Sequence, residues 1–186
     1  MILPIYTYGQ LVLREEAEPI DKNYPELQQL VNDMFETMYQ ADGVGLAAPQ
    51  IGLPICLFVI DANALSKDFP ECKDFKRVMI NPKIIEKSGK IITLEEGCLS
   101  FPGIHEKVER NACITVKYSD ENLNPQEEII EGFTARIVQH ECDHLEGQVF
   151  IDYISPIRKQ LNKGKLNNII KGTIKCAYRI KPTKKY

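Results

Sequence analysis

Two histidines and a glutamate lie at a spacing that favours metal chemistry. The stretch 139–147 reads QHECDHLEG and contains the pattern His-Glu-x-x-His. In a helix, residues four apart differ by about 40° of rotation, so His140 and His144 face the same side and can bind one ion. Glu141 is offset by about 100°, close enough to act on a neighbouring water without being a ligand. Because the chain has only three histidines, this pairing favours a metal site over a chance arrangement.

Two histidines leave a catalytic metal site incomplete, so the class of the protein depends on the third ligand. The metzincin pattern requires a histidine where this chain has Phe150, and no histidine follows His144. Of the downstream acids, Glu146 would point away from the ion, and Asp152 is a weak candidate. The third ligand is therefore expected upstream.

The segment 94–103, which reads LEEGCLSFPG, and the nearby His105 offer two upstream candidates. Cys98 lies between a glycine and a polar loop that ends in proline, where the backbone can approach another group closely. A thiolate is a strong ligand for zinc or ferrous iron. A Cys-His-His set also leaves one coordination position open for water, as a catalytic site requires. We favour Cys98 over His105, for which an ordinary surface or core position is the alternative.

A third stretch, 43–52, reads GVGLAAPQIG and combines small residues with a single carboxamide. Small residues let a substrate backbone lie against the chain, and the amide of Gln50 can donate to a developing oxyanion. A tight connection between a helix and a strand would have a similar composition. This stretch by itself therefore leaves both interpretations open.

Together, the three stretches resemble the motifs of peptide deformylases, which remove the N-formyl group from nascent polypeptides. The family motifs have the forms Gly-φ-Gly-φ-Ala-Ala-x-Gln, Glu-Gly-Cys-φ-Ser and Gln-His-Glu-x-Asp-His, where φ is apolar. The chain carries them in this order at 43–50, 96–100 and 139–144. The resemblance extends over most of residues 1–155. It implies a metal-dependent hydrolase that acts on N-formyl-methionyl peptides and releases formate.

The resemblance also implies a role for each motif residue. The implied metal ligands are Cys98, His140 and His144, with Glu141 as general base and then acid. The implied oxyanion donors are Gln50 and the backbone N–H of Leu99. The implied substrate-binding residues are Gly45, which would contact the substrate backbone, and Val44, Phe133 and Ile137, which would receive the methionine side chain. The implied cofactor is one divalent ion, with Fe2+ favoured and Zn2+, Ni2+ or Co2+ as alternatives.

Two other classes of protein share part of this pattern. A zinc-dependent endopeptidase would use the same glutamate and histidines. A structural metal module would need a fourth protein ligand. Cys142 is a poor candidate for that ligand, because two residues from His140 it points to another side of the helix, where a small apolar residue packs well.

Two helices and a group of strands are expected to position these residues. Apolar residues recur at helical spacing over 23–41, with Asn23 as the cap, Pro25 in the first turn and Gly43 as the left-handed stop. A second helix is predicted over 133–146. Strands are predicted at 55–61, 77–80, 84–86, 91–94, 112–118 and 127–131. A weaker helix (159–171) and a terminal strand (173–180) are predicted near the C-terminus.

This order of elements predicts an α+β fold, since the strands cluster between two helices without βαβ alternation. We expect short, mostly antiparallel strands around a central helix that bears the His-Glu-x-x-His pattern, with an N-terminal amphipathic helix. The chain is 44% hydrophobic and 26% charged, typical of a globular protein, so a single catalytic domain over 1–186 is expected.

Composition also bears on location and partners. The first residues lack the charge and apolar run of a signal peptide, which predicts a cytoplasmic protein that does not contact a membrane. The net charge is −3, yet residues 153–186 hold ten Lys or Arg and no acid, in a region that varies within the family. This basic C-terminal segment suggests contact with ribosomal RNA, and a solvated tail is the alternative.

Overall fold

An antiparallel five-stranded sheet in the order β2-β3-β4-β5-β6 forms the frame of the protein. The computed structural model describes residues 1–183, and residues 184–186, the end of the basic C-terminal segment, lie outside it. The strands of this sheet are β2 (Gly45–Ala47), β3 (Leu57–Asp61), β4 (Lys76–Gly97), β5 (His105–Ser119) and β6 (Pro125–Glu131). A smaller sheet pairs β1 (Ile5–Tyr6) in parallel with β7 (Ile180–Lys181).

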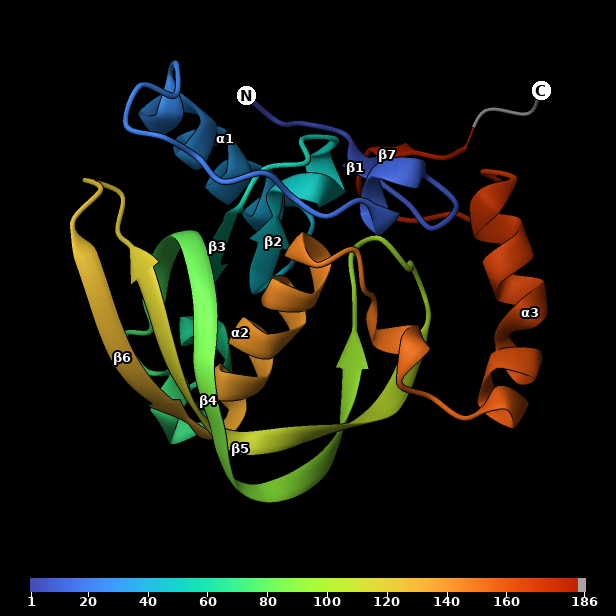
Figure 1. Ribbon diagram of the computed structural model, residues 1–186. Coiled ribbons are helices and arrows are strands. Elements are labelled where there is room, and N and C mark those ends of the chain that lie inside the picture. Colours follow the sequence, from blue (N-terminus) through green and yellow to red (C-terminus); the bar gives the residue numbers. More distant parts are fainter. Residues whose placement is uncertain (184–186) are drawn as a thin grey trace.

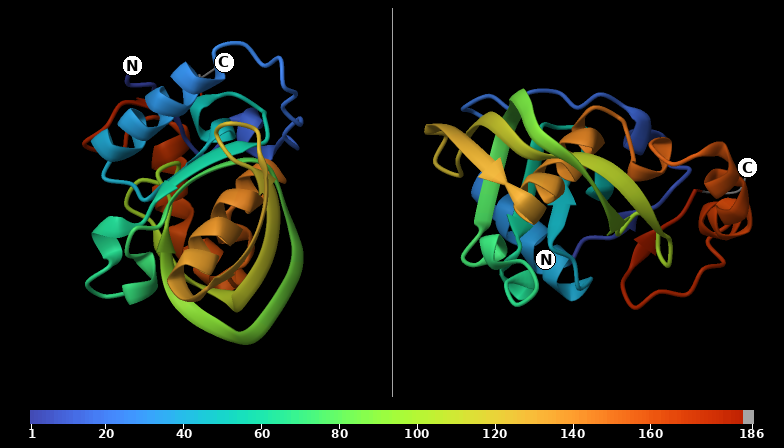
Figure 2. Two further views of the ribbon diagram at one scale, coloured as in Figure 1. Left: turned by 90° about the vertical axis from the view of Figure 1, so that its left-hand side faces the viewer. Right: turned by 90° about the horizontal axis from the view of Figure 1, so that it is seen from below.

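Strands β4 and β5 form a long hairpin that curls around helix α2 (Gly132–Leu145). The register between them shifts at three places from Ile80 to Ile91. Each irregularity bends the strands and increases their twist. The left view of Figure 2 shows α2 enclosed by the curved band of β4, β5 and β6. The expected segments 77–80, 84–86 and 91–94 are parts of one strand, because the bulges interrupt the alternation without ending the pairing.

The expected α+β class, with mostly antiparallel strands, is confirmed, and three α-helices pack on or beside the sheet (Figure 1). Helix α1 (Leu27–Gln40) buries Val31, Met34 and Met38 in one hydrophobic cluster with β2 and β3. Its boundaries differ from the expectation. Asn23 does not cap it, since Glu26 precedes the helix in a left-handed conformation with no side-chain cap. The left-handed residue after the helix is Asp42, with φ 57°, because aspartate tolerates this conformation and Gly43 is not required for it.

Helix α2 occupies the centre of the molecule, and most of its residues are buried. Ala135, Ile137, Val138 and Leu145 lie in the main hydrophobic cluster. The helix begins at Gly132, whose φ of +65° places it in the left-handed region. The N–H of Phe133 donates to Glu71 Oε1 at 2.7 Å, which satisfies one of the free donors of the first turn. Packing and this distant carboxylate therefore fix the helix that carries the histidines.

Helix α3 (Pro156–Ile170) stands at one side of the molecule (Figure 1). Its cap is Ser155, whose hydroxyl accepts the N–H of Arg158, and Leu166 and Ile169 join a third hydrophobic cluster. The expected strand at 173–180 is largely wrong, since only the two residues of β7 pair and their partner strand β1 is equally short. None of the helices within residues 1–183 has both the length and the apolar character needed to cross a bilayer.

Candidate metal centre

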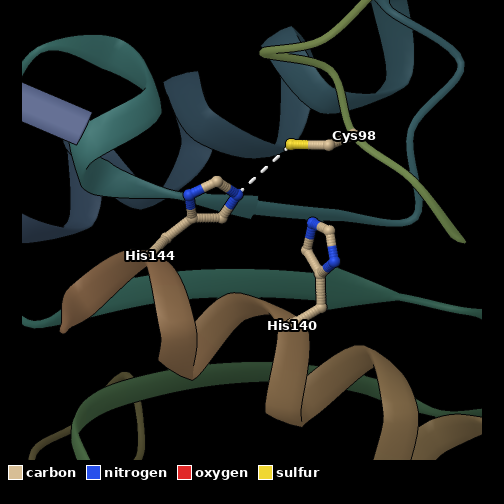
Figure 3. Close-up of side chains that lie close together, drawn as sticks. All are labelled: Cys98, His140 and His144. Atoms are coloured by element: carbon tan, nitrogen blue, oxygen red, sulfur yellow. Dashed lines mark hydrogen bonds between the residues drawn. The ribbon is translucent and has the colours of Figure 1, made fainter. Parts of the chain in front are cut away.

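Cys98, His140 and His144 meet at one point between the end of β4 and helix α2 (Figure 3). Their candidate ligand atoms all lie within 4.8 Å of one another, and Cys98 Sγ is 3.3 Å from His144 Nε2. Metal–sulfur and metal–nitrogen bonds of about 2.3 and 2.0 Å give ligand separations of roughly 3.5 Å in a tetrahedral site. The three donors therefore fit a single divalent ion. His105, the rival ligand, is exposed at the start of β5 and is not a member of the cluster.

A turn directly after β4 presents the cysteine. The N–H of Phe101 donates to the carbonyl of Cys98 at 2.9 Å, which closes a four-residue turn. The amide of Gln50 reaches this turn, with Nε2 3.2 Å from Ser100 Oγ and 3.4 Å from Cys98 Sγ. The other end of the same amide accepts the N–H of Ala47 through Oε1 at 2.8 Å. These contacts orient the Gln50 amide so that its NH2 group faces the cysteine.

The carboxylate of Glu96 supports the histidine side of the cluster. His140 Nδ1 lies 2.9 Å from Glu96 Oε2, which leaves Nε2 of that ring for an ion. Glu96 also accepts two hydrogen bonds from Arg110, at 2.9 and 3.0 Å, and one from Arg136 at 2.6 Å. Arg110 then donates to Asp143 at 2.6 Å. Two carboxylates and two guanidinium groups therefore compensate one another in the interior beside the site.

The titration of these buried groups follows from their neighbours. Burial opposes ionisation of Glu96, but hydrogen bonds from His140 and Arg110 hold its pKa well below its usual range. Burial also opposes protonation of His140, but its hydrogen bonds with Cys98 and Glu96 raise its pKa. Burial lowers the pKa of His144 well below the usual value. His144 is thus held neutral, the form in which imidazole binds metals.

Glu141 differs from Glu96, because no cation within residues 1–183 forms an ion pair with it. The residue is 4% exposed, and in the described part of the chain its Oε2 has no hydrogen-bond partner. Burial raises its pKa to about 7. Gly45 allows this position, since a Cβ built there would lie 2.9 Å from Glu141 Cδ. A carboxyl group with such a pKa can accept and return a proton near neutral pH.

A pocket of about 330 Å³ opens beside the cluster. It is lined by all of the candidate residues except His144, which is buried. The candidate residues in the lining are Val44, Gly45, Gln50, Cys98, Leu99, Phe133, Ile137, His140 and Glu141. A larger groove of about 900 Å³ lies beside the β4–β5 hairpin and holds none of these residues.

The arrangement of a neutral histidine, a second imidazole, a thiol and a free buried carboxylate at a pocket defines a metal-dependent hydrolase of the His-Glu-x-x-His type. A family model described as polypeptide deformylase matches residues 2–160. The chain therefore belongs to the peptide deformylase family, whose members hydrolyse the N-formyl group of nascent polypeptides with one divalent metal ion.

Individual relatives agree with the family match. The chain is 48% identical to a peptide deformylase of Christiangramia forsetii, with 97% of this chain and 96% of that protein covered. A crystal structure of the Thermotoga maritima peptide deformylase is 42% identical and superposes with a TM-score of 0.76, over 84% of this chain and 99% of that one. A structure from Legionella pneumophila is 39% identical with a TM-score of 0.81, over 93% and 98%. These matches do not favour an endopeptidase or a structural metal module.

Three buried residues beside the ligands support the site, although the sequence assigned them no role. Arg110 and Arg136 have nothing in their local sequence that distinguishes them from surface charges. Asp143 is the aspartate of the motif at 139–144, and Arg136 lies within the predicted helix at 133–146, close to its histidines. Tyr178 also lines the pocket, although it lies 34 residues after His144 in the sequence.

Replacement of Glu96 by glutamine is expected to lower both stability and metal affinity. Glu96→Gln keeps the shape of the side chain but leaves Arg110 and Arg136 short of a negative partner in the interior, a change of roughly 3–5 kcal/mol for a broken buried pair. Loss of the partner of His140 should weaken metal binding by about 10- to 100-fold. Urea unfolding and chelator competition measure the two effects. Glu95→Gln, at the exposed neighbouring position, is the matched control and should resemble the wild type.

Proposed function

We propose that Glu141 is the general base and then the general acid of deformylation. The observation that carries this proposal is its buried, unpaired carboxylate oxygen beside the ligand cluster. Glu141 Oε2 accepts a proton from the attacking water, whose oxygen bonds to the formyl carbon. When the carbon–nitrogen bond breaks, the same carboxyl returns the proton to the leaving amine nitrogen. Formate and a free amino terminus are the products.

Cys98, His140 and His144 would hold the divalent ion, and we propose that this ion is Fe2+. When bound, a divalent ion supplies Lewis acidity and a nucleophilic water at neutral pH. One soft thiolate and two imidazoles form a donor set that suits ferrous iron. The same donors also accept Zn2+, Ni2+ and Co2+, so metal analysis has to decide between them.

The oxyanion would be bound by Gln50 and by the backbone N–H of Leu99. The Gln50 amide is fixed by its hydrogen bond from Ala47, so Nε2 stays directed at the Cys98 turn. Donors that are oriented before the reaction stabilise the developing charge without reorganisation. In acyl-transfer enzymes the loss of one such donor costs roughly 3–4 kcal/mol of barrier.

The substrate would enter the pocket with its methionine side chain against Val44, Phe133 and Ile137. These residues line one pocket with Cys98 and His140, and the ring of Phe133 stacks on that of Phe69 with centroids 4.1 Å apart. Gly45 would contact the substrate backbone. Because Gly45 has no side chain, the backbone of β2 is open on the side that faces Glu141. An apolar pocket beside a backbone edge suits an extended formyl-Met peptide.

We further propose that the chain works as a single catalytic domain in the cytoplasm, where formylated chains are made, and that its basic C-terminal segment contacts the ribosome. Part of the basic charge serves the fold, since Arg158 pairs with Glu106 at 2.8 Å. Lys163 and Lys171 are exposed on or just after α3 and are among the groups that could meet ribosomal phosphates.

Removal of the Glu141 carboxylate is expected to abolish turnover but not metal binding. Glu141→Gln should lower kcat by about 10²- to 10⁴-fold, the range for loss of a general acid–base group, with metal content unchanged. A formate-release assay on a formyl-Met peptide measures the rate. Glu146→Gln, at the end of the same helix, serves as the control. A Glu141→Gln enzyme that lost its metal would contradict the proposed role.

Replacement of the thiolate ligand is expected to reduce metal content. Cys98→Ser exchanges a soft ligand for a poorer one, so less metal should remain after anaerobic purification, as measured by elemental analysis. Cys113→Ser alters another half-buried cysteine, on β5, and should leave the content unchanged. The wild-type protein should contain mainly iron. If Cys98→Ser keeps full metal content and activity, Cys98 is not the third ligand and His105 replaces it as the candidate.

Charge reversal on α3 is expected to weaken ribosome binding. Truncation is unsuitable, because Leu166 and Ile169 belong to a hydrophobic cluster. The double variant Lys163→Glu/Lys171→Glu should co-sediment less with ribosomes, and added salt should release the wild type. Lys67→Glu, between β3 and β4, is the control, because it tests whether reversal of any exposed surface charge weakens ribosome binding. If neither the charge reversal nor added salt changes ribosome binding, the proposed contact is refuted.

A further inference from the structure

The C-terminal segment 173–183 returns to the catalytic pocket after α3. It passes β1, where β7 pairs with Ile5 and Tyr6 (Figure 1). The N–H of Ile5 donates to the carbonyl of Arg179 at 2.9 Å, and Gln10 Nε2 donates to the carbonyl of Pro182 at 2.9 Å. The segment is therefore anchored directly after Tyr178, although the family match ends at residue 160.

Within residues 1–183, the hydroxyl of Tyr178 makes one hydrogen bond, and it is with the turn that presents Cys98. Its hydroxyl donates to the backbone carbonyl of Leu99 at 2.7 Å. The ring is half-buried and lines the same pocket as Cys98 and Glu141. Burial raises the pKa of Tyr178, so the hydroxyl keeps its proton and remains a donor.

The Leu99 carbonyl, which accepts this hydrogen bond, belongs to the central peptide of the turn. Cys98 and Phe101 are its first and last residues, so the Leu99–Ser100 peptide is its central unit. The central peptide of such a turn can rotate between two orientations, which differ in the direction of that carbonyl. The two ends of the turn are already held, by the bond from Phe101 to Cys98 and by the N–H of Tyr8, which donates to the carbonyl of Ser100 at 3.0 Å. A donor on the Leu99 carbonyl thus restrains the one remaining rotation.

We propose that Tyr178 is a positioning residue for deformylation, because its hydroxyl holds the carbonyl of Leu99 and so restrains the backbone of the residue whose N–H, on the preceding Cys98–Leu99 peptide, is directed at the reacting carbonyl. The inference rests on the proposed role of the Leu99 N–H as an oxyanion donor. It makes the C-terminal segment part of the active site. Tyr178 acts through the turn and does not touch the reacting atoms.

The test compares two tyrosines that each lose one phenol hydrogen bond. Tyr178→Phe keeps the ring and removes the donor. Tyr118→Phe is the matched control, since the Tyr118 hydroxyl also donates a 2.7 Å hydrogen bond, to Glu128, outside the pocket. Both full-length holoenzymes are assayed for formate release, metal content and thermal midpoint.

A positioning role predicts a change in kcat alone. In Tyr178→Phe, kcat should fall about three- to tenfold, the scale set by one neutral hydrogen bond, while KM and metal content stay near wild type. Tyr118→Phe should keep the wild-type kcat. The proposal is overturned if Tyr178→Phe matches the control in kcat or changes KM alone. It is also overturned if Tyr178→Phe loses its metal or destabilises the protein more than Tyr118→Phe, since the role would then be structural.

The same assay separates this proposal from the proposed catalytic roles. Glu141→Gln is measured beside the two tyrosine variants. If Glu141→Gln loses turnover and Tyr178→Phe does not, the positioning inference alone fails. If Glu141→Gln retains turnover, the assignment of the catalytic base fails, whatever the tyrosine variants show.

Discussion

One buried carboxylate, that of Glu96, connects the parts of the protein that must meet for the site to exist. It lies on β4, two residues before Cys98, and it binds His140 and Arg136 on α2 and Arg110 on β5. An unpaired charge at this depth would be strongly unfavourable, so the strand, the hairpin and the helix have to dock in the arrangement that satisfies it. The same contacts set the distance between the thiol and the histidines. Fold and metal site therefore depend on one set of hydrogen bonds.

Close approach of backbone and side chains is the second constraint. Helix α2 can lie inside the curled hairpin because register shifts bend β4 against β5. Gly45 leaves room for the carboxylate of Glu141, and at the edge of the hairpin Gly97 leaves room for the ring of His105, to which a Cβ would come within 2.7 Å. Gly45 thus lets Glu141 stay buried, and burial raises its pKa into the range useful for proton transfer.

The chain termini add a further layer to the pocket. Strands β1 and β7 come from opposite ends of the sequence and pair beside the turn that presents Cys98. The backbone of Tyr8 reaches this turn from one terminus, and the hydroxyl of Tyr178 reaches it from the other. The turn is held by elements that lie about 90 and 80 residues away along the chain, as often occurs where a loop must be rigid to function.

Local spacing decided the features that the sequence alone could reveal. The period of the α-helix placed His140, Glu141 and His144 on adjoining faces, and apolar spacing located α1 and α2 to within a few residues. The resemblance of three short motifs indicated the family. Long-range contacts decided the rest: the merging of three predicted strands into β4, the reduction of the predicted terminal strand to two residues, the ion-pair network of Glu96 and the approach of Tyr178. Such features could not be read from the sequence, because they arise between residues far apart in it, and a buried charge or a hydrogen-bonded hydroxyl has the same local signature as an exposed one.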